Sequence, residues 1–118
     1  MILIIGGYAS GKYEYIVNEL GYNDSQMANA ILDDSSVLIN LNELIKSSDT
    51  ELDDEFYNKL LTKEVISCCE VGSGVVPLDR NERDYRESVG RICIELAKSA
   101  NKVIRMYCGI PIVIKGDI

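Results

Sequence analysis

The sequence predicts an α/β fold in which helices cover a mostly parallel sheet of about five strands that ends in an antiparallel hairpin. Three observations support this prediction. Short β-branched runs typical of buried strands alternate along the chain with amphipathic helical segments. Only the last two runs follow each other directly, across a glycine turn. The chain has 118 residues, the length of one small domain, so we expect residues 1–118 to form a single domain.

Each element follows from residue type and spacing. The apolar runs predict strands at 2–5, 37–39, 63–69, 103–108 and 110–115. Helical spacing predicts helices at 13–20, 41–45, 51–62 and 79–100, with weak helical character at 25–32. Asp79 and Glu82 resemble a capping box for the longest helix. Gly90 lies inside that helix, and because glycine weakens a helix, we expect a close packing contact there. The apolar stripe of the longest helix comprises Tyr85, Val89, Ile92, Cys93, Leu96, Ala97 and Ala100.

A phosphate-binding pattern connects the first strand to the first helix. Gly6, Gly11 and Lys12 have the spacing Gly-x-x-x-x-Gly-Lys of a phosphate-binding loop (P-loop). Glycines allow backbone N–H groups to converge on phosphate oxygens, and a lysine at the start of the helix adds positive charge. The alternative is a glycine-rich turn that binds nothing. The predicted binding residues are Gly6, Gly7, Tyr8, Ala9, Ser10, Gly11, Lys12 and Tyr13.

The residues that would hold Mg²⁺ are missing from this pattern. A magnesium-dependent loop has Ser or Thr after the lysine, whereas this chain has Tyr13, whose hydroxyl lies a whole ring further out. The second predicted strand ends at Asn40, where such proteins usually carry an acid. Asn40 also suits the cap of the helix at 41–45. We therefore predict no metal ligands and do not count Mg²⁺ as an expected cofactor.

Composition excludes several functions. The net charge of −7 leaves no broad basic surface for nucleic acid. No apolar run approaches the roughly 20 residues of a membrane span, and the N-terminus lacks the features of a signal peptide. We therefore expect a cytoplasmic protein without a membrane partner. The sequence has no histidine, which excludes histidine nucleophile pairs and histidine metal sites. We expect the four cysteines, which lie in apolar stretches, to be buried and reduced: Cys68, Cys69, Cys93 and Cys108.

A second candidate position follows the third predicted strand. Glu70 begins a loop with two glycines, and loops at the carboxyl ends of strands are where open α/β sheets bind ligands. Because Glu70 is the only acid there, we assign it a hypothetical catalytic role beside Lys12, namely orienting an acceptor hydroxyl or a water.

Residues 70–115 resemble the C-terminal part of the adenosylcobinamide kinase/adenosylcobinamide-phosphate guanylyltransferase family. The resemblance rests on E-V-G-S-G-V-V-P beginning at Glu70, on the Arg/Glu-rich helix that follows, and on the turn Gly109-Ile110-Pro111. The opening MILIIGGYASGK resembles the family's P-loop, and VLINLNELI resembles its second, acid-bearing strand. The family residues retained here are Gly6, Gly7, Ser10, Gly11, Lys12, Glu70, Gly72, Gly74 and Pro77.

The resemblance implies a RecA-like, three-layer P-loop fold that binds ATP or GTP and acts late in cobalamin biosynthesis. Members phosphorylate the aminopropanol arm of adenosylcobinamide, attach GMP to that phosphate through a guanylylated histidine, and tend to form oligomers. This chain departs from the family at Tyr13 and at Asn40. It also has a shortened interval, 20–36, where the family histidine would lie, and that interval contains none.

Three hypotheses about function follow. The preferred one is a degenerate homologue that binds a nucleotide, or a cobinamide, without guanylyltransferase activity. The alternative is an active, shortened adenosylcobinamide kinase in which Lys12 and Glu70 are catalytic. The second alternative is an interaction protein that binds no nucleotide and forms oligomers. The expected partners are therefore a nucleotide, cobinamide and further copies of the same chain.

Overall fold

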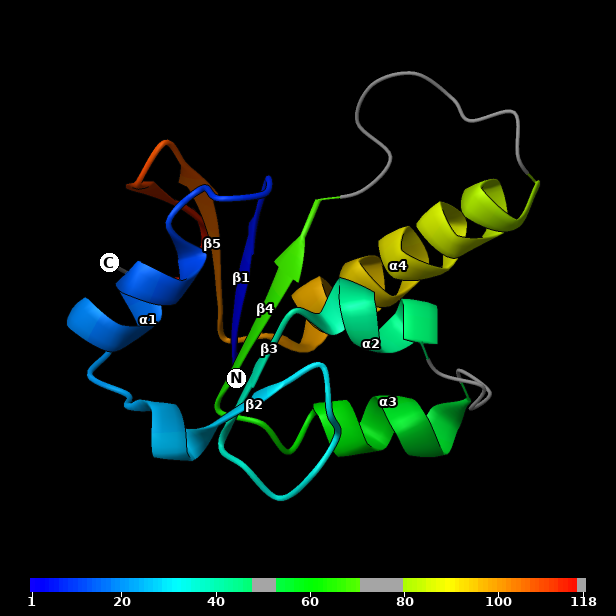
Figure 1. The fold of residues 1–118 in the computed structure, drawn as a ribbon, viewed down its shortest axis with the longest axis horizontal. Coiled ribbons are helices and arrows are strands. Elements are labelled where there is room, and N and C mark those ends of the chain that lie inside the picture. Colours follow the sequence, from blue (N-terminus) through cyan, green and yellow to red (C-terminus); the bar gives the residue numbers. More distant parts are fainter. Residues whose placement is uncertain (48–52, 71–79, 117–118) are drawn as a thin grey trace.

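A single six-stranded sheet organises the computed structural model, which describes residues 1–47, 53–70 and 80–116. Over these residues the strand order is β2-β3-β4-β1-β5-β6 (Figure 1). The neighbouring strands pair in parallel except β5 and β6, which are antiparallel. The strands are β1 (Ile2–Gly6), β2 (Met27–Asn29), β3 (Val37–Ile39), β4 (Val65–Cys69), β5 (Lys102–Tyr107) and β6 (Ile110–Lys115). The predicted mostly parallel α/β fold with a C-terminal hairpin is confirmed.

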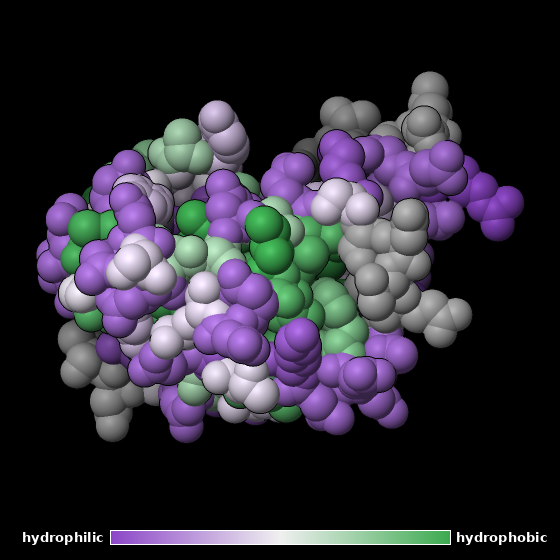
Figure 2. All heavy atoms as spheres, turned by 60° about the horizontal axis from the view of Figure 1, so that its bottom comes forward, coloured by the Kyte–Doolittle hydropathy of each residue, from purple (hydrophilic) through white to green (hydrophobic). Residues whose placement is uncertain are grey.

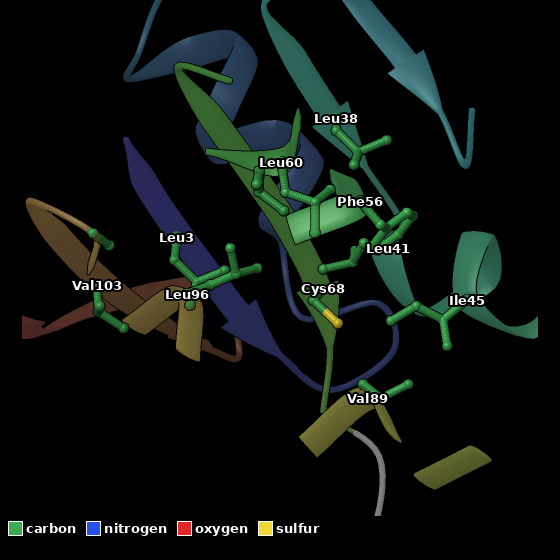
Figure 3. Close-up of a cluster of buried hydrophobic side chains, with 12 residues drawn as sticks. Leu3, Leu38, Leu41, Ile45, Phe56, Leu60, Cys68, Val89, Leu96 and Val103 are labelled. Carbon is green, nitrogen blue, oxygen red and sulfur yellow. The ribbon is translucent and has the colours of Figure 1, made fainter. Parts of the chain in front are cut away.

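Helices cover both faces of this sheet and make three layers (Figure 1). The helix α1 lies on one face, and its residue Ile16 packs with Ile4 and Ile104. The other three α-helices lie on the opposite face, where they contribute to a second apolar cluster (Figure 3). Because both faces are covered, the central strands are continuous apolar runs instead of alternating ones. The helices are α1 (Lys12–Asn18), α2 (Leu41–Ser47), α3 (Asp54–Leu60) and α4 (Arg80–Ser99).

The predicted apolar stripe of α4 faces the sheet as expected. All of its members belong to, or pack against, the apolar cluster that contains Leu3 and Cys68. The helix α3 begins after Asp53, whose side chain accepts a hydrogen bond from the Phe56 N–H at 3.0 Å. The proposed partner Asp79 of the capping box, and the loop glycines Gly72 and Gly74, lie outside the described residues.

The segment expected to be weakly helical, 25–32, is the main error of the secondary-structure prediction. A short 3₁₀ turn, η1 (Asp24–Gln26), leads into β2, which pairs in parallel with β3. A strand of only three residues has too few positions to show a period, so its pairing partner decides its structure. The connection from β2 to the parallel strand β3 contains no helix. The buried Lys63 ammonium donates to the carbonyls of Asp33 and Ser35 in this connection.

Two smaller expectations are wrong. A Cβ built on Gly90 meets no atom within 4 Å, so this glycine makes no close packing contact among the described residues. Cys108 is exposed, because it lies in the turn between β5 and β6, while Cys68 is fully buried. Cys69 and Cys93 are partly buried, and all four thiols are free.

Hydrophilic side chains cover most of the face drawn in Figure 2, around a group of apolar side chains near its centre. None of the described helices is long and apolar enough to cross a membrane.

Candidate phosphate-binding site

The loop between β1 and α1 is held against β5 by close backbone contacts. A Cβ at Gly6 would lie 2.5 Å from Ser10 Oγ and 2.7 Å from the Met106 carbonyl oxygen, so only glycine fits there. The Ser10 carbonyl accepts a hydrogen bond from the Gly109 N–H at 2.9 Å. Gly11, with φ of 98°, is in the left-handed region that favours glycine. The glycines of the pattern therefore serve a tightly folded turn.

Lys12 closes this turn with its own side chain. The residue is only 8% exposed, and its ammonium donates to the carbonyls of Gly7 at 2.6 Å and Gly6 at 3.3 Å, and to Ser10 Oγ at 3.3 Å. These partners are uncharged. In the described parts of the chain no carboxylate forms an ion pair with Lys12. A buried ammonium without a counter-charge strongly favours the arrival of an anion.

The start of α1 adds further donors beside the lysine. Gly11 is the N-terminal cap residue, and no side chain caps the helix there. The first N–H groups of a helix have no partner inside the helix and carry partial positive charge. Backbone donors and the Lys12 ammonium thus lie at the same place. A Cβ built on Gly7 meets nothing within 4 Å among the described residues, which leave the outer side of the loop open.

A pocket of about 410 Å³ lies between this loop and the carboxyl ends of three strands. Gly6 is level with Cys69 of β4 in the sheet, and β3 lies beside β4, which brings these strand ends together. This is the edge at which open α/β sheets bind ligands. The residues around the pocket are Tyr8, Ala9, Ser10, Gly11, Lys12, Tyr13, Glu14, Asn29, Ile39, Asn40, Ser67 and Cys69.

Neutral polar groups occupy the wall of the pocket opposite the loop. The Asn40 side-chain amide donates to Asn29 Oδ1 at 2.8 Å, and the Asn40 N–H donates to Ser67 Oγ at 3.2 Å. Asn40 precedes α2 and its carbonyl accepts from the Glu43 N–H, but its side chain is turned to Asn29. Sequence reasoning missed Asn29 and Ser67. The one signal for Ser67 was a polar residue inside the apolar run of β4, where it is 2% exposed.

These residues do not fit a protein-held Mg²⁺. The Tyr13 hydroxyl donates to the Asp24 carboxylate, and this hydrogen bond is the main cause of the raised pKa of Tyr13. The hydroxyl is therefore engaged away from the place of a loop Ser. Asn40 carries no charge, and among the described residues Glu14 is the one carboxylate of the pocket wall. The described residues contain no group of three or more acidic or thiol side chains that could hold a metal ion.

Glu70, the second predicted catalytic residue, lies on the other side of the loop. Its N–H donates to the Gly6 carbonyl at 2.8 Å, which fixes it beside β1. Its carboxylate pairs with the Arg105 guanidinium of β5 through contacts of 3.0 Å and 3.2 Å. Glu70 and Arg105 line a second cavity of about 260 Å³, which shares Tyr8, Ala9 and Ser10 with the first pocket but is not lined by Lys12. The structure therefore does not bring Lys12 and Glu70 into one cavity. Sequence reasoning also missed Arg105.

The other predicted binding residues lie along the same loop. Tyr8 is 93% exposed at the outer rim, while Ala9 has a positive φ of 55° in the bend. Ser10 is buried, and its Oγ accepts a hydrogen bond from the Lys12 ammonium. Binding by any of these residues stays a prediction.

Comparison with known proteins identifies the family. The sequence model of the family described as cobinamide kinase / cobinamide phosphate guanyltransferase matches residues 16–114. The match begins within α1, after the glycine loop, and runs to β6, so it includes Glu70 and Arg105. No curated protein matches the chain. The family has a P-loop and acts as a kinase and transferase in cobalamin biosynthesis, in agreement with the resemblance noted in the sequence. The chain belongs to the cobinamide kinase / cobinamide phosphate guanyltransferase family.

Proposed function

We propose that this protein binds the phosphates of ATP or GTP at the loop from Gly6 to Tyr13, without a protein-held Mg²⁺ and without guanylyltransferase activity. The observation that carries the proposal is the Lys12 ammonium. It is buried, its hydrogen-bond acceptors among the described residues are all uncharged groups of its own loop, and it lies beside an uncapped helix start.

The energetic argument concerns an exchange of hydrogen bonds. In the structure the ammonium donates to the Gly7 carbonyl and, over longer distances, to the Gly6 carbonyl and Ser10 Oγ. A phosphate oxygen offers a charged acceptor, and charge-assisted hydrogen bonds contribute roughly twice as much as neutral ones. Helix N–H groups add to the same binding because they carry partial positive charge. Binding of a polyphosphate therefore needs only a reorientation of the Lys12 side chain.

The absence of guanylyl transfer follows from the sequence. The family's route passes through a guanylylated histidine, and the chain has none. Opposite the loop the pocket is lined by Asn29, Ile39, Asn40, Ser67 and Cys69, so the family's histidine has no histidine counterpart there. Among these only Ser67 has a hydroxyl, and it is 2% exposed and accepts a hydrogen bond from Asn40.

The kinase alternative requires an acid that works together with Lys12. Glu70 is the acid that the family resemblance retains, yet its carboxylate is paired with Arg105 and lines a different cavity. Both observations favour the nucleotide-binding protein over the kinase.

Thermal unfolding with ATP or GTP, in EDTA and in Mg²⁺, tests the proposal. A nucleotide at 100 times its Kd stabilises the folded state by about 2.7 kcal/mol. We expect this stabilisation in EDTA and expect Lys12→Ala to abolish it. The matched control is Lys59→Ala, which removes an exposed lysine of α3 and leaves the loop intact.

Each other outcome contradicts a definite part of the proposal. Stabilisation that requires Mg²⁺, together with phosphoryl transfer from the nucleotide to cobinamide, would establish the kinase. If no nucleotide stabilises the wild-type protein, the loop does not bind nucleotides and the interaction protein remains. An equal response of the wild type and Lys12→Ala would place the nucleotide elsewhere.

A further inference from the structure

The cavity on the far side of the loop has its own cation. It is lined by Gly7–Ser10, by Glu70, and by Arg105 and its neighbours 106–108 on β5 and in the following turn. Arg105 reaches this place because β5 pairs directly with β1, which ends at the loop. Neither the P-loop pattern nor the proposed nucleotide site includes Arg105.

The Arg105 guanidinium holds an anion in the structure already, namely the Glu70 carboxylate. Its Nε lies 3.0 Å from Glu70 Oε1 and its Nη2 lies 3.2 Å from Glu70 Oε2. Two parallel contacts of this kind form the bidentate geometry that suits carboxylates and phosphates equally. The Arg105 guanidinium is therefore arranged to accept an external anion of similar shape in place of the Glu70 carboxylate.

The fold does not depend on this pair. The Arg105 side chain is 47% exposed and that of Glu70 is 27% exposed, and ion pairs between partly exposed groups contribute little to stability. Neighbours on both sides of Arg105 in β5, Ile104 and Met106, are buried and hold the strand in place. The carboxylate can leave the guanidinium without a loss of core packing.

The cavity is also open to a ligand beside the guanidinium. A Cβ built on Gly7 meets no atom of the described residues within 4 Å, so the described part of the chain leaves free space next to the loop backbone. The volume of about 260 Å³ is ample for one phosphate group and small for a whole nucleotide.

We propose that this cavity is a second anion site, which takes a phosphate group on Arg105 and which the Glu70 carboxylate occupies when no phosphate is bound. Glu70 then competes with the ligand and is not a catalytic acid. The cavity shares the loop residues Tyr8, Ala9 and Ser10 with the Lys12 pocket, but Lys12 does not line it, so the proposal does not require nucleotide binding at Lys12.

Titration with inorganic phosphate in EDTA, at constant ionic strength, tests this inference through the sign of two substitutions. Glu70→Gln removes the competing charge and keeps the shape, so phosphate affinity should rise by about tenfold. Arg105→Gln removes the guanidinium that would bind the phosphate, so the phosphate affinity should fall by at least about tenfold. The double variant should behave like Arg105→Gln alone. Isothermal titration and ³¹P line broadening supply the affinities.

An exposed ion pair on α4 provides matched controls. Arg91 Nη2 lies 2.8 Å from Glu87 Oε1, and both side chains are largely exposed. Glu87→Gln and Arg91→Gln change the net charge by the same amounts as the two test substitutions, so they report the effect of overall charge. We expect phosphate affinity close to that of the wild type in both. Urea unfolding of all variants checks that they are folded.

Four results would overturn the inference. A lower phosphate affinity of Glu70→Gln would mean that the carboxylate takes part in binding. Unchanged affinity in both Glu70→Gln and Arg105→Gln, or the absence of any phosphate binding, would show that Arg105 is not a phosphate ligand. Changes of equal size in the α4 controls would assign the effect to net charge.

Discussion

The contact between Gly6 and β5 yields the sharpest prediction about the loop. In Gly6→Ala the new methyl group would lie 2.5 Å from Ser10 Oγ and 2.7 Å from the Met106 carbonyl oxygen. The carbonyl belongs to the backbone of β5, which pairs with β1 at this level and cannot move alone. Ser10 Oγ accepts from Lys12 at 3.3 Å, so displacing it also loses a hydrogen bond.

The expected cost follows from these two contacts. Overpacking in a tight interior costs about 1–3 kcal/mol, and a lost hydrogen bond costs about 1 kcal/mol. We therefore expect Gly6→Ala to lower the free energy of unfolding by about 2–4 kcal/mol. The matched control is Gly7→Ala, whose methyl group would meet no atom of the described residues within 4 Å and should change stability by less than about 0.5 kcal/mol.

Urea denaturation followed by circular dichroism measures both variants. The quantity to compare is the free energy of unfolding, at a common slope, for the two alanine substitutions. Equal stability of Gly6→Ala and Gly7→Ala would refute the reasoning, because it would mean that the loop moves away from β5 without cost. The same result would weaken the case for a preformed phosphate site.

Two further predictions concern buried groups away from the loop. Lys63→Met removes the ammonium that donates to two carbonyls of the connection before β3, and we expect the free energy of unfolding in urea to fall by about 2–3 kcal/mol. Lys59→Met, at an exposed position, should leave this free energy unchanged. An equal effect of both substitutions would mean that the Lys63 hydrogen bonds do not stabilise the connection. The exposed Cys108 should react with a thiol reagent in the folded protein, while Cys68 should react only on unfolding, because its hydrogen bond with Cys93 and its burial raise its pKa. Labelling of Cys68 before Cys108, read by mass spectrometry, would show that the core opens locally.

The glycine loop could be predicted well because its contacts are local. Lys12 bonds to groups that are two to six positions away in the chain, so the spacing of glycines and lysine carries the information. The departure at Tyr13 was visible for the same reason. Its actual partner, Asp24, depends on how the chain returns after α1, and no local pattern indicates it.

Strand prediction shows the same division. Apolar runs identified the central strands, because burial on both faces requires such runs. The three residues of β2 have no such pattern, and they form a strand only because they pair with the edge of β3. The open space beside Gly90 could not be foreseen either, since a helix pattern does not say what packs against each position.

Sequence alone therefore determined the class of fold, the loop with its lysine, the family and the lack of a histidine. The tertiary structure decided which residues meet across the sheet. Because β1 lies between β4 and β5, Glu70 meets Arg105, which is 35 positions further along the chain, and it lies in a different cavity from Lys12. Strand order is set by long-range packing of whole elements, which residue spacing within one segment does not encode.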